Sequence, residues 1–208
     1  MFNLVLKGGW MMVPIILGSI IGLAVFLERY KSIKTNELKS AEHMKAIREL
    51  LEIGHLKDAY QFCLSNASSI ANILRGAMKN YERSYQEIQD SIQSVGRLEA
   101  SRLEQNLNII YTVATVSPLL GFLGTVLGMV KAFQKIEALG GGVNATVLAG
   151  GIWEALITTV AGLLVGIPML IAYNYMAARI DSFVLGLEEN SIEMMDLVLS
   201  NKERKTNT

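Results

Sequence analysis

Residues 146–178 read TVLAGGIWEALITTVAGLLVGIPMLIAYNYMAA, an apolar stretch in which Glu154 is the one charged side chain. A helix needs about 20 predominantly apolar residues to cross the hydrocarbon core of a bilayer. Two further stretches carry no charge at all, residues 8–27 and residues 105–130. A soluble fold rarely holds three such stretches, because its helices usually run to roughly 8–20 residues. The sequence therefore predicts an all-α membrane protein with three transmembrane helices.

Composition narrows the class of protein further. The 208 residues include 19 Lys and Arg and 19 Asp and Glu, so the net charge is zero and a basic nucleic-acid-binding protein is not expected. The single cysteine, Cys63, excludes an internal disulfide and a cysteine-based metal site. The sequence shows no phosphate-binding glycine loop of the nucleotide-binding type and no arrangement of nucleophile and base. We expect neither an enzyme nor a bound cofactor or metal, and we expect the energy source to be an ion gradient.

The distribution of Lys and Arg predicts the orientation in the membrane. Residues 28–104 hold 12 of them and the segment after residue 178 holds four, whereas Lys7, Lys131 and Lys135 are the three on the other side. Basic residues concentrate on the cytoplasmic side of membrane spans. We therefore expect a periplasmic N-terminus and a cytoplasmic C-terminus.

The same patterns predict the order of segments along the chain. Apolar residues recur at helical spacing beyond the second and third spans, on their cytoplasmic sides, so both helices should extend into the cytoplasm. Nothing in the sequence after residue 70 predicts a break before Pro118. The expected segments are a periplasmic N-terminus (1–7), a first transmembrane helix (8–27), a cytoplasmic helical domain (28–104), a second transmembrane helix continuous with a cytoplasmic helix (105–133), a periplasmic link (134–145), a third transmembrane helix (146–178), a cytoplasmic helix (179–200) and a disordered tail (201–208).

Glu154 is the candidate for chemistry. An ionised carboxylate inside a spanning helix costs several kcal/mol, and such residues usually face a cavity or the interior of a helix bundle. Glu154 lies about 12 Å along the third span from its outer end, by helical rise. Burial favours the neutral acid, so this carboxyl group can take up and release protons as its surroundings change. The alternative is a structural acid that is hydrogen-bonded between helices.

Hydroxyl groups and glycines surround this position in the sequence. Thr158 shares a helix face with Glu154, Thr159 lies on the adjoining face, and the second span supplies Thr115, Ser117 and Thr125. These hydroxyls can line a polar path, or they can bond to the carbonyl one turn back in their own helix, and position alone leaves both open. Small residues allow close approach of helices in lipid. The glycines expected to pack the helices are Gly121, Gly124, Gly128, Gly162 and Gly166.

Two motifs carry a family resemblance. Residues 117–129 read SPLLGFLGTVLGM and residues 151–163 read GIWEALITTVAGL, the latter followed by Ile167-Pro168 and by AYN at 172–174. The sequence resembles the ExbB/TolQ/MotA family of proton-channel subunits, and within it the ExbB/TolQ branch, with ExbB the most similar. The resemblance extends over nearly the whole chain and is weak at residues 35–80.

The resemblance implies a homopentamer in the bacterial inner membrane, with a pore lined by the second and third spans. The pore would enclose the transmembrane helices of an ExbD/TolR-like single-span partner, commonly a dimer, which supplies an Asp. Proton flow would move the partner, which acts on a TonB-like protein or the Tol-Pal system. Glu154 matches the pore glutamate, and Thr125 and Thr159 match the pore threonines. Thr158, Ser117 and Thr115 are possible pore-lining residues.

Several alternatives stay open beside a proton-driven motor of TonB-dependent outer-membrane transport. One is a TolQ-like subunit of the Tol-Pal system or a gliding-type motor. Another is a passive scaffold, in which Glu154 only pairs structurally with a partner. A flagellar stator of the MotA type is less consistent, because such subunits are longer and have four spans. The lone membrane carboxylate favours protons over sodium as the coupling ion.

Overall fold

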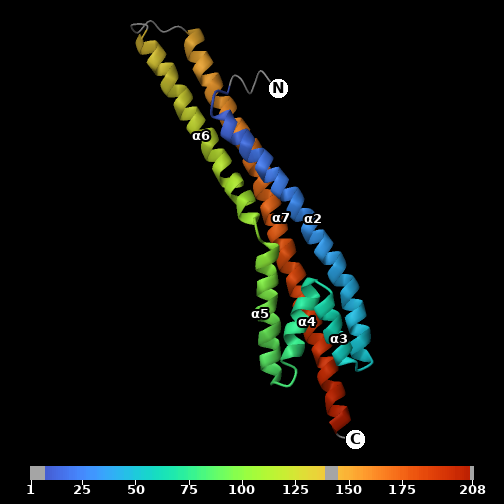
Figure 1. The fold of residues 1–208 in the computed structure, drawn as a ribbon. Coiled ribbons are helices and arrows are strands. Elements are labelled where there is room, and N and C mark those ends of the chain that lie inside the picture. Colours follow the sequence, from blue (N-terminus) through green and yellow to red (C-terminus); the bar gives the residue numbers. More distant parts are fainter. Residues whose placement is uncertain (1–7, 139–144, 207–208) are drawn as a thin grey trace. The chain divides into compact units, whose positions relative to one another are not determined.

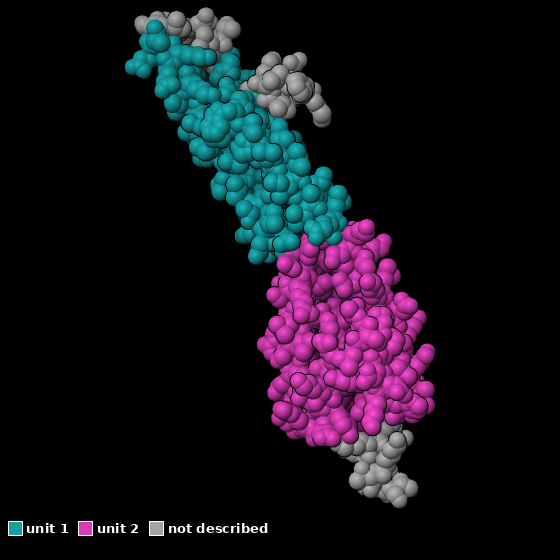
Figure 2. All heavy atoms as spheres, viewed as in Figure 1, with its two compact units in different colours: residues 1–28, 106–175 teal, residues 29–105, 176–208 magenta. Residues whose placement is uncertain are grey.

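The structure, a computed structural model, describes residues 8–138 and 145–206 (Figure 1). All regular elements within these residues are helices, as predicted. They are α2 (Met12–Glu52), α3 (Leu56–Ser65), α4 (Ser69–Lys79), α5 (Tyr85–Leu103), α6 (Leu107–Ala138) and α7 (Ala145–Thr206). The predicted N-terminal segment 1–7 and residues 139–144 of the predicted link lie outside the described residues. The chain divides into two compact units, residues 1–28 with 106–175 (unit 1) and residues 29–105 with 176–208 (unit 2) (Figure 2).

Unit 1 has the surface of a membrane protein. It contains α6 and the first parts of α2 and α7, which run side by side (Figure 1). Large apolar side chains point outward, and Leu119, Phe122 and Leu164 are 64–70% exposed. The contacts between helices are instead made by small residues such as Gly121 and Ala155. This arrangement exposes apolar area that water would disfavour and lipid would accept. Among the described residues three helices, α2, α6 and α7, are long and apolar enough to cross a membrane, in agreement with the three spans predicted.

Two of these helices continue well beyond their apolar segments. Helix α2 runs without interruption to Glu52, from the predicted first span (8–27) into the residues that the sequence assigns to the following helical domain. The continuation has a physical reason, since the sequence contains no glycine or proline between Gly22 and Gly54. Helix α7 has 62 residues and stays helical to Thr206, where the sequence predicts a disordered tail from residue 201.

The helix expected to run without a break from residue 70 into the second span is divided in the structure. Ser84 begins α5 with a capping box, in which its hydroxyl accepts from the Glu87 N–H (3.3 Å) and the Glu87 carboxylate accepts from the Ser84 N–H (3.1 Å). The Ser84 N–H and, after it, the Ser84 hydroxyl (2.9 Å) donate to the Glu87 carboxylate and hold the pKa of Glu87 below its ordinary value. A second break separates α5 from α6 at Asn106, whose φ of 68° is left-handed. Asparagine adopts this conformation more readily than most residues.

Unit 2 is built like a water-soluble helical domain. Its core lies between the short helices and the later parts of α2 and α7, and fully buried side chains include Ile47, Leu74 and Ile92. Cys63 belongs to this core, and burial raises the pKa of its thiol to about 12, so the thiol stays protonated. A two-bonded ion pair joins α7 to α2, with Arg179 donating to Glu37 at 2.8 and 2.6 Å.

We expect the stability of unit 2 to depend on pH because Glu188 is partly buried. Its carboxyl group lies against Gly96 of α5, and partial burial raises its pKa, although Arg97 acts in the opposite direction. Folding therefore favours protonated Glu188. The stabilisation that protonated Glu188 provides is fully present below the pKa of Glu188 in the unfolded chain. It is lost as the pH rises through the raised pKa of Glu188 in the folded chain. Glu188→Gln should stabilise the protein at pH 7.5, by on the order of a few tenths of a kcal/mol because solvent screens this partly exposed site.

Thermal unfolding of the purified chain at pH 4.5 and pH 7.5 measures this effect. The pH dependence of the unfolding midpoint should be smaller in Glu188→Gln than in the wild type. Glu189→Gln, on an exposed neighbour, controls for the loss of one charge. Equal pH dependence in all three proteins would contradict the expectation.

Candidate functional site

Glu154 lies on α7 and has a charged partner on α6. Its Oε1 atom is 2.9 Å from the Nζ atom of Lys131, and the two side chains are 30% and 47% exposed. Both residues belong to unit 1. The arrangement places a carboxylate and an ammonium in contact within the helices that are apolar enough to cross a membrane.

A glycine turn closes over the carboxylate from a third direction. Gly9 has a φ of 67°, and its carbonyl accepts the N–H of Met12 (3.2 Å) just before α2. A Cβ atom added at Gly9 would overlap Oε1 of Glu154 and come within 3.2 Å of its Cδ atom. Gly8 also lies near α7, since its Cβ would lie 3.2 Å from Ile157. Glycine at position 9 thus permits both the left-handed backbone and the close approach of the carboxylate.

Two threonine hydroxyls meet between α6 and α7. The Oγ1 atoms of Thr125 and Thr159 are hydrogen-bonded to each other. Each also lies within hydrogen-bond distance of a carbonyl oxygen on the facing helix, Thr125 Oγ1 of that of Ala155 (3.3 Å) and Thr159 Oγ1 of that of Gly121 (3.2 Å). A hydroxyl has one proton to donate, so the one that donates to its neighbour leaves the other to donate to a carbonyl. Thr159 is five residues from Glu154, about 7.5 Å along the helix axis. The structure therefore brings Thr125 and Thr159 together, in the same helix pair as Glu154.

The other hydroxyls predicted as possible pore-lining groups have local roles. Thr158 is buried and donates to the carbonyl of Ala155 (2.7 Å), and Thr115 is exposed and donates to that of Tyr111 (2.9 Å). Ser117 is buried beside α2, 3.9 Å from where a Cβ of Gly18 would stand. Thr115 lies ten residues from Thr125 along α6, about 15 Å by helical rise. The structure does not place Thr115 or Ser117 at the Glu154 carboxylate.

The five glycines chosen from the sequence all lie where α6 and α7 approach each other. A Cβ at Gly121 would meet the backbone of Thr158 and Thr159, and one at Gly162 would meet that of Ser117 and Gly121. Gly124 faces the side chain of Thr158 and Gly128 faces Ala155, while Gly166 faces Pro118. These contacts set an antiparallel register, and that register brings Lys131 beside Glu154.

Sequence reasoning missed Lys131 and Gly9 as neighbours of Glu154. Lys131 was counted only as a basic residue on the periplasmic side. The signal that could have found it is the pairing of small residues between the two motifs. Helices α6 and α7 are antiparallel, so residues that follow Gly128 on α6 lie near residues that precede Ala155 on α7. Once Gly128 is paired with Ala155, Lys131 therefore comes near Glu154. Within the described residues no group of three or more His, Cys, Asp or Glu could hold a metal ion.

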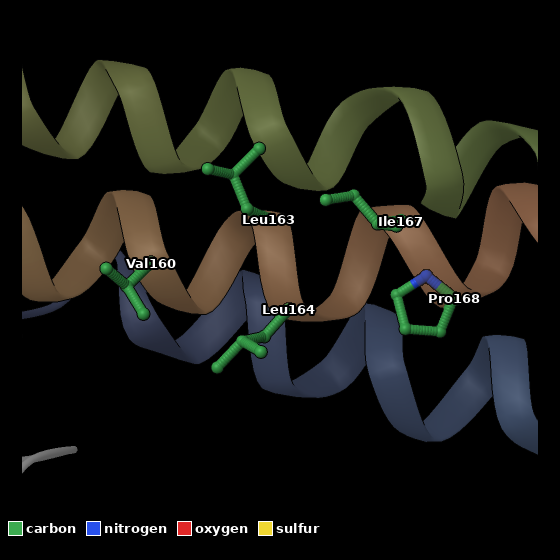
Figure 3. A pocket seen from close by; sticks show the side chains of 5 residues that line it. All are labelled: Val160, Leu163, Leu164, Ile167 and Pro168. Atoms are coloured by element: carbon green, nitrogen blue, oxygen red, sulfur yellow. The ribbon is translucent and has the colours of Figure 1, made fainter.

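The outer face of α7 is apolar and hollowed. A pocket of about 290 Å³ lies along it, and Figure 3 shows that its lining side chains all come from this one helix. The lining residues are Val160, Leu163, Leu164, Ile167 and Pro168. Such a face suits lipid or another apolar helix and offers no polar group to a soluble ligand.

Comparison with known proteins identifies the family of the chain. The chain matches the MotA/TolQ/ExbB proton channel family over residues 65–189, a range that includes Glu154 and both central threonines. A biopolymer transport protein ExbB homologue of Methanothermobacter thermautotrophicus is 30% identical over 155 residues, which are 74% of this chain and 54% of that protein. An ExbB-like biopolymer transport protein of Synechocystis is 30% identical over 177 residues, 81% of each chain.

A third relative is a TolQ protein. The Tol-Pal system protein TolQ of Pseudomonas aeruginosa is 34% identical over 128 residues, 56% of this chain and 55% of that protein. The chain thus spans about half the length of two of these three relatives. Because the family match covers more than half of the sequence and the relatives are ExbB and TolQ homologues, the chain belongs to the MotA/TolQ/ExbB proton channel family, in its ExbB/TolQ branch.

Proposed function

We propose that the chain is the proton-channel subunit of a motor driven by the proton-motive force in the bacterial inner membrane. Glu154 takes up a proton from one side of the membrane and releases it to the other. The observation that carries this proposal is a carboxyl group held within apolar spanning helices, in the same helix pair as the hydrogen-bonded Thr125 and Thr159. Carboxyl groups at such depth mark ion and proton pathways.

The threonine pair supports a path for protons through the same helices. Hydroxyl groups both donate and accept hydrogen bonds, so a pair that bridges two helices can relay or orient a proton carrier. Thr125 and Thr159 bridge α6 and α7, whose membrane segments otherwise expose mainly apolar side chains. We assign Glu154, Thr125 and Thr159 to the proton pathway on this basis.

We propose that five copies of the chain form a ring around the membrane helices of an ExbD/TolR-like single-span partner, commonly a dimer. The apolar outer face of α7 supports this assembly, because a further apolar helix or lipid can pack against it (Figure 3). The N-terminus would be periplasmic and the C-terminus cytoplasmic, in keeping with the distribution of Lys and Arg. The partner's acid would exchange protons with Glu154.

The partner also determines what the motor drives. We favour TonB-dependent outer-membrane transport, with a TolQ-like role in the Tol-Pal system or a gliding-type motor as the alternative, since relatives named ExbB and TolQ both match the chain. A passive scaffold is the alternative from another class. The ion pair of Lys131 with Glu154 is the observation in its favour, because such a pair can hold two helices together without any proton transfer.

Assembly is tested by expressing the chain together with single-span proteins encoded near it, and by weighing the detergent-purified complex by native mass spectrometry. The proposal predicts five copies of this chain with a partner that carries an Asp in its span. A stable monomer that binds no such partner would contradict it. The proton-transfer claim is tested separately, through Glu154.

A further inference from the structure

Lys131 is the cation that faces the proposed proton site. Its Nζ atom is 2.9 Å from Oε1 of Glu154, and the Gly9 turn lies against the same carboxylate oxygen. The carboxylate therefore touches an ammonium on one side and a glycine backbone on another. This contact joins α6 to α7 at the end of unit 1 where α6 ends and α7 begins.

Few other charged residues of unit 1 are described besides Glu154 and Lys131. Apart from this pair, the charged residues described in unit 1 are Glu28, at the far end of the α2 segment, and Lys135 and Glu137, on the last turns of α6. Residues 8–27, which include the Gly9 turn, carry no charge. Lys135 is four residues further along α6 than Lys131, about 6 Å by helical rise. The electrostatics of Glu154 within these residues are therefore dominated by Lys131.

We propose that Lys131 is a positioning residue for Glu154: it holds the carboxylate in its ionised form against the Gly9 turn and sets the pH at which Glu154 takes up a proton. This inference rests on the proposed function and adds how the same site is regulated. When a proton adds to the carboxylate, the acid becomes neutral and the ion pair is lost. The ammonium keeps its own proton and moves away, and it returns when Glu154 releases its proton.

The physical reason is the cost of an unpaired charge in an apolar environment. Two opposite charges in contact compensate each other, and neutralising one leaves the other without a partner. The flexible four-carbon stem of lysine lets its charged head reach a more polar region at the end of a helix. Protonation of Glu154 is thereby coupled to a movement of the Lys131 side chain at the contact of α6 with α7, which an uncharged neighbour would not provide.

The test measures the protonation state of Glu154 directly. Dicyclohexylcarbodiimide reacts with protonated carboxyl groups in apolar surroundings, and peptide mass spectrometry assigns the modified residue. Membranes that hold the full chain with its partner are labelled across pH 5–9. The variants are Lys131→Met, Lys131→Gln and Lys131→Arg, with Lys135→Met as the matched control on the same helix and Glu154→Gln as the blank.

Loss of an adjacent opposite charge favours the neutral form of an acid by one pH unit or more. Lys131→Met and Lys131→Gln should therefore increase labelling of Glu154 at pH 7.5 by about tenfold and move the whole profile to higher pH. Lys131→Arg and Lys135→Met should follow the wild-type profile.

Two results would overturn the inference. One is a labelling profile for both neutral variants that matches the wild type. The other is failure of both neutral variants to assemble while Lys131→Arg assembles, because the lysine would then act in folding. The proposed function fails on a different result, namely proton flow or transport that persists when Glu154 is replaced by glutamine.

Discussion

Glu154→Gln should reduce energy-dependent transport to the background level while the complex still assembles. Glutamine has nearly the size of glutamic acid and keeps its hydrogen-bonding capacity, but it cannot take up and release a proton at physiological pH. The change leaves Gly9 and the threonine pair untouched, so the packing of α6 against α7 should persist. A loss of function in an assembled complex would therefore report lost proton transfer.

The measurement is complementation of a strain that lacks the chain, scored by the growth or envelope phenotype that its partner system supports. Membrane levels and native complex size are measured on the same cells. Glu137→Gln is the matched control, because Glu137 is an exposed acid near the end of α6. Full activity of Glu154→Gln would support the passive scaffold, whereas loss of activity in both variants would remove the special role of Glu154.

Gly162→Ala should have the largest effect on folding among single-methyl changes in unit 1. The added Cβ would overlap the carbonyl oxygen of Ser117 and come within 3.1 Å of the Cα atom of Gly121. Both obstacles are backbone atoms of α6, so no side chain can rotate away. Overpacking at a close contact costs about 1–3 kcal/mol. We expect a lower unfolding midpoint in detergent and less protein in the membrane.

Gly150 provides the control for this change. It lies on the same helix as Gly162, and a Cβ placed there meets no atom within 4 Å. Gly150→Ala should keep the wild-type midpoint or raise it slightly, because alanine favours helix more than glycine does. If the two variants unfold at the same midpoint, the close contact of α6 and α7 does not determine the stability of unit 1.

The sequence predicts the membrane helices better than it predicts the ends of the helices around them. The lack of charge in three stretches marks the spans, since that signal depends only on composition. The break at Asn106 depends on one left-handed residue, and the start of α5 depends on the reciprocal bonds of Ser84 and Glu87. Such signals are short and are hidden inside a continuing apolar pattern. The charges that begin at Glu28 mark the end of the apolar span in the sequence, but charged residues favour helix as well, so α2 continues through them.

Some residues of the candidate site can be predicted from the sequence and others only from the structure. Glu154 stands out in the sequence because a charge is rare inside an apolar stretch, and the motif around it points to Thr125 and Thr159. Lys131 and Gly9 reach the site only through tertiary packing, from another helix and from the turn before α2. Gly9 has no spacing in the sequence that links it to residue 154, and Lys131 is linked to it only once Gly128 is paired with Ala155. Lys131 also carries a charge that counts as a topology signal, which concealed its contact with Glu154.

Proton flux in liposomes shows directly whether protons cross the membrane by way of Glu154. The complete complex of this chain with its single-span partner is reconstituted, a membrane potential is imposed, and internal pH is followed in sodium-free buffer. We expect acidification with the wild-type complex and none above empty liposomes with Glu154→Gln. Equal flux through the two complexes would contradict it.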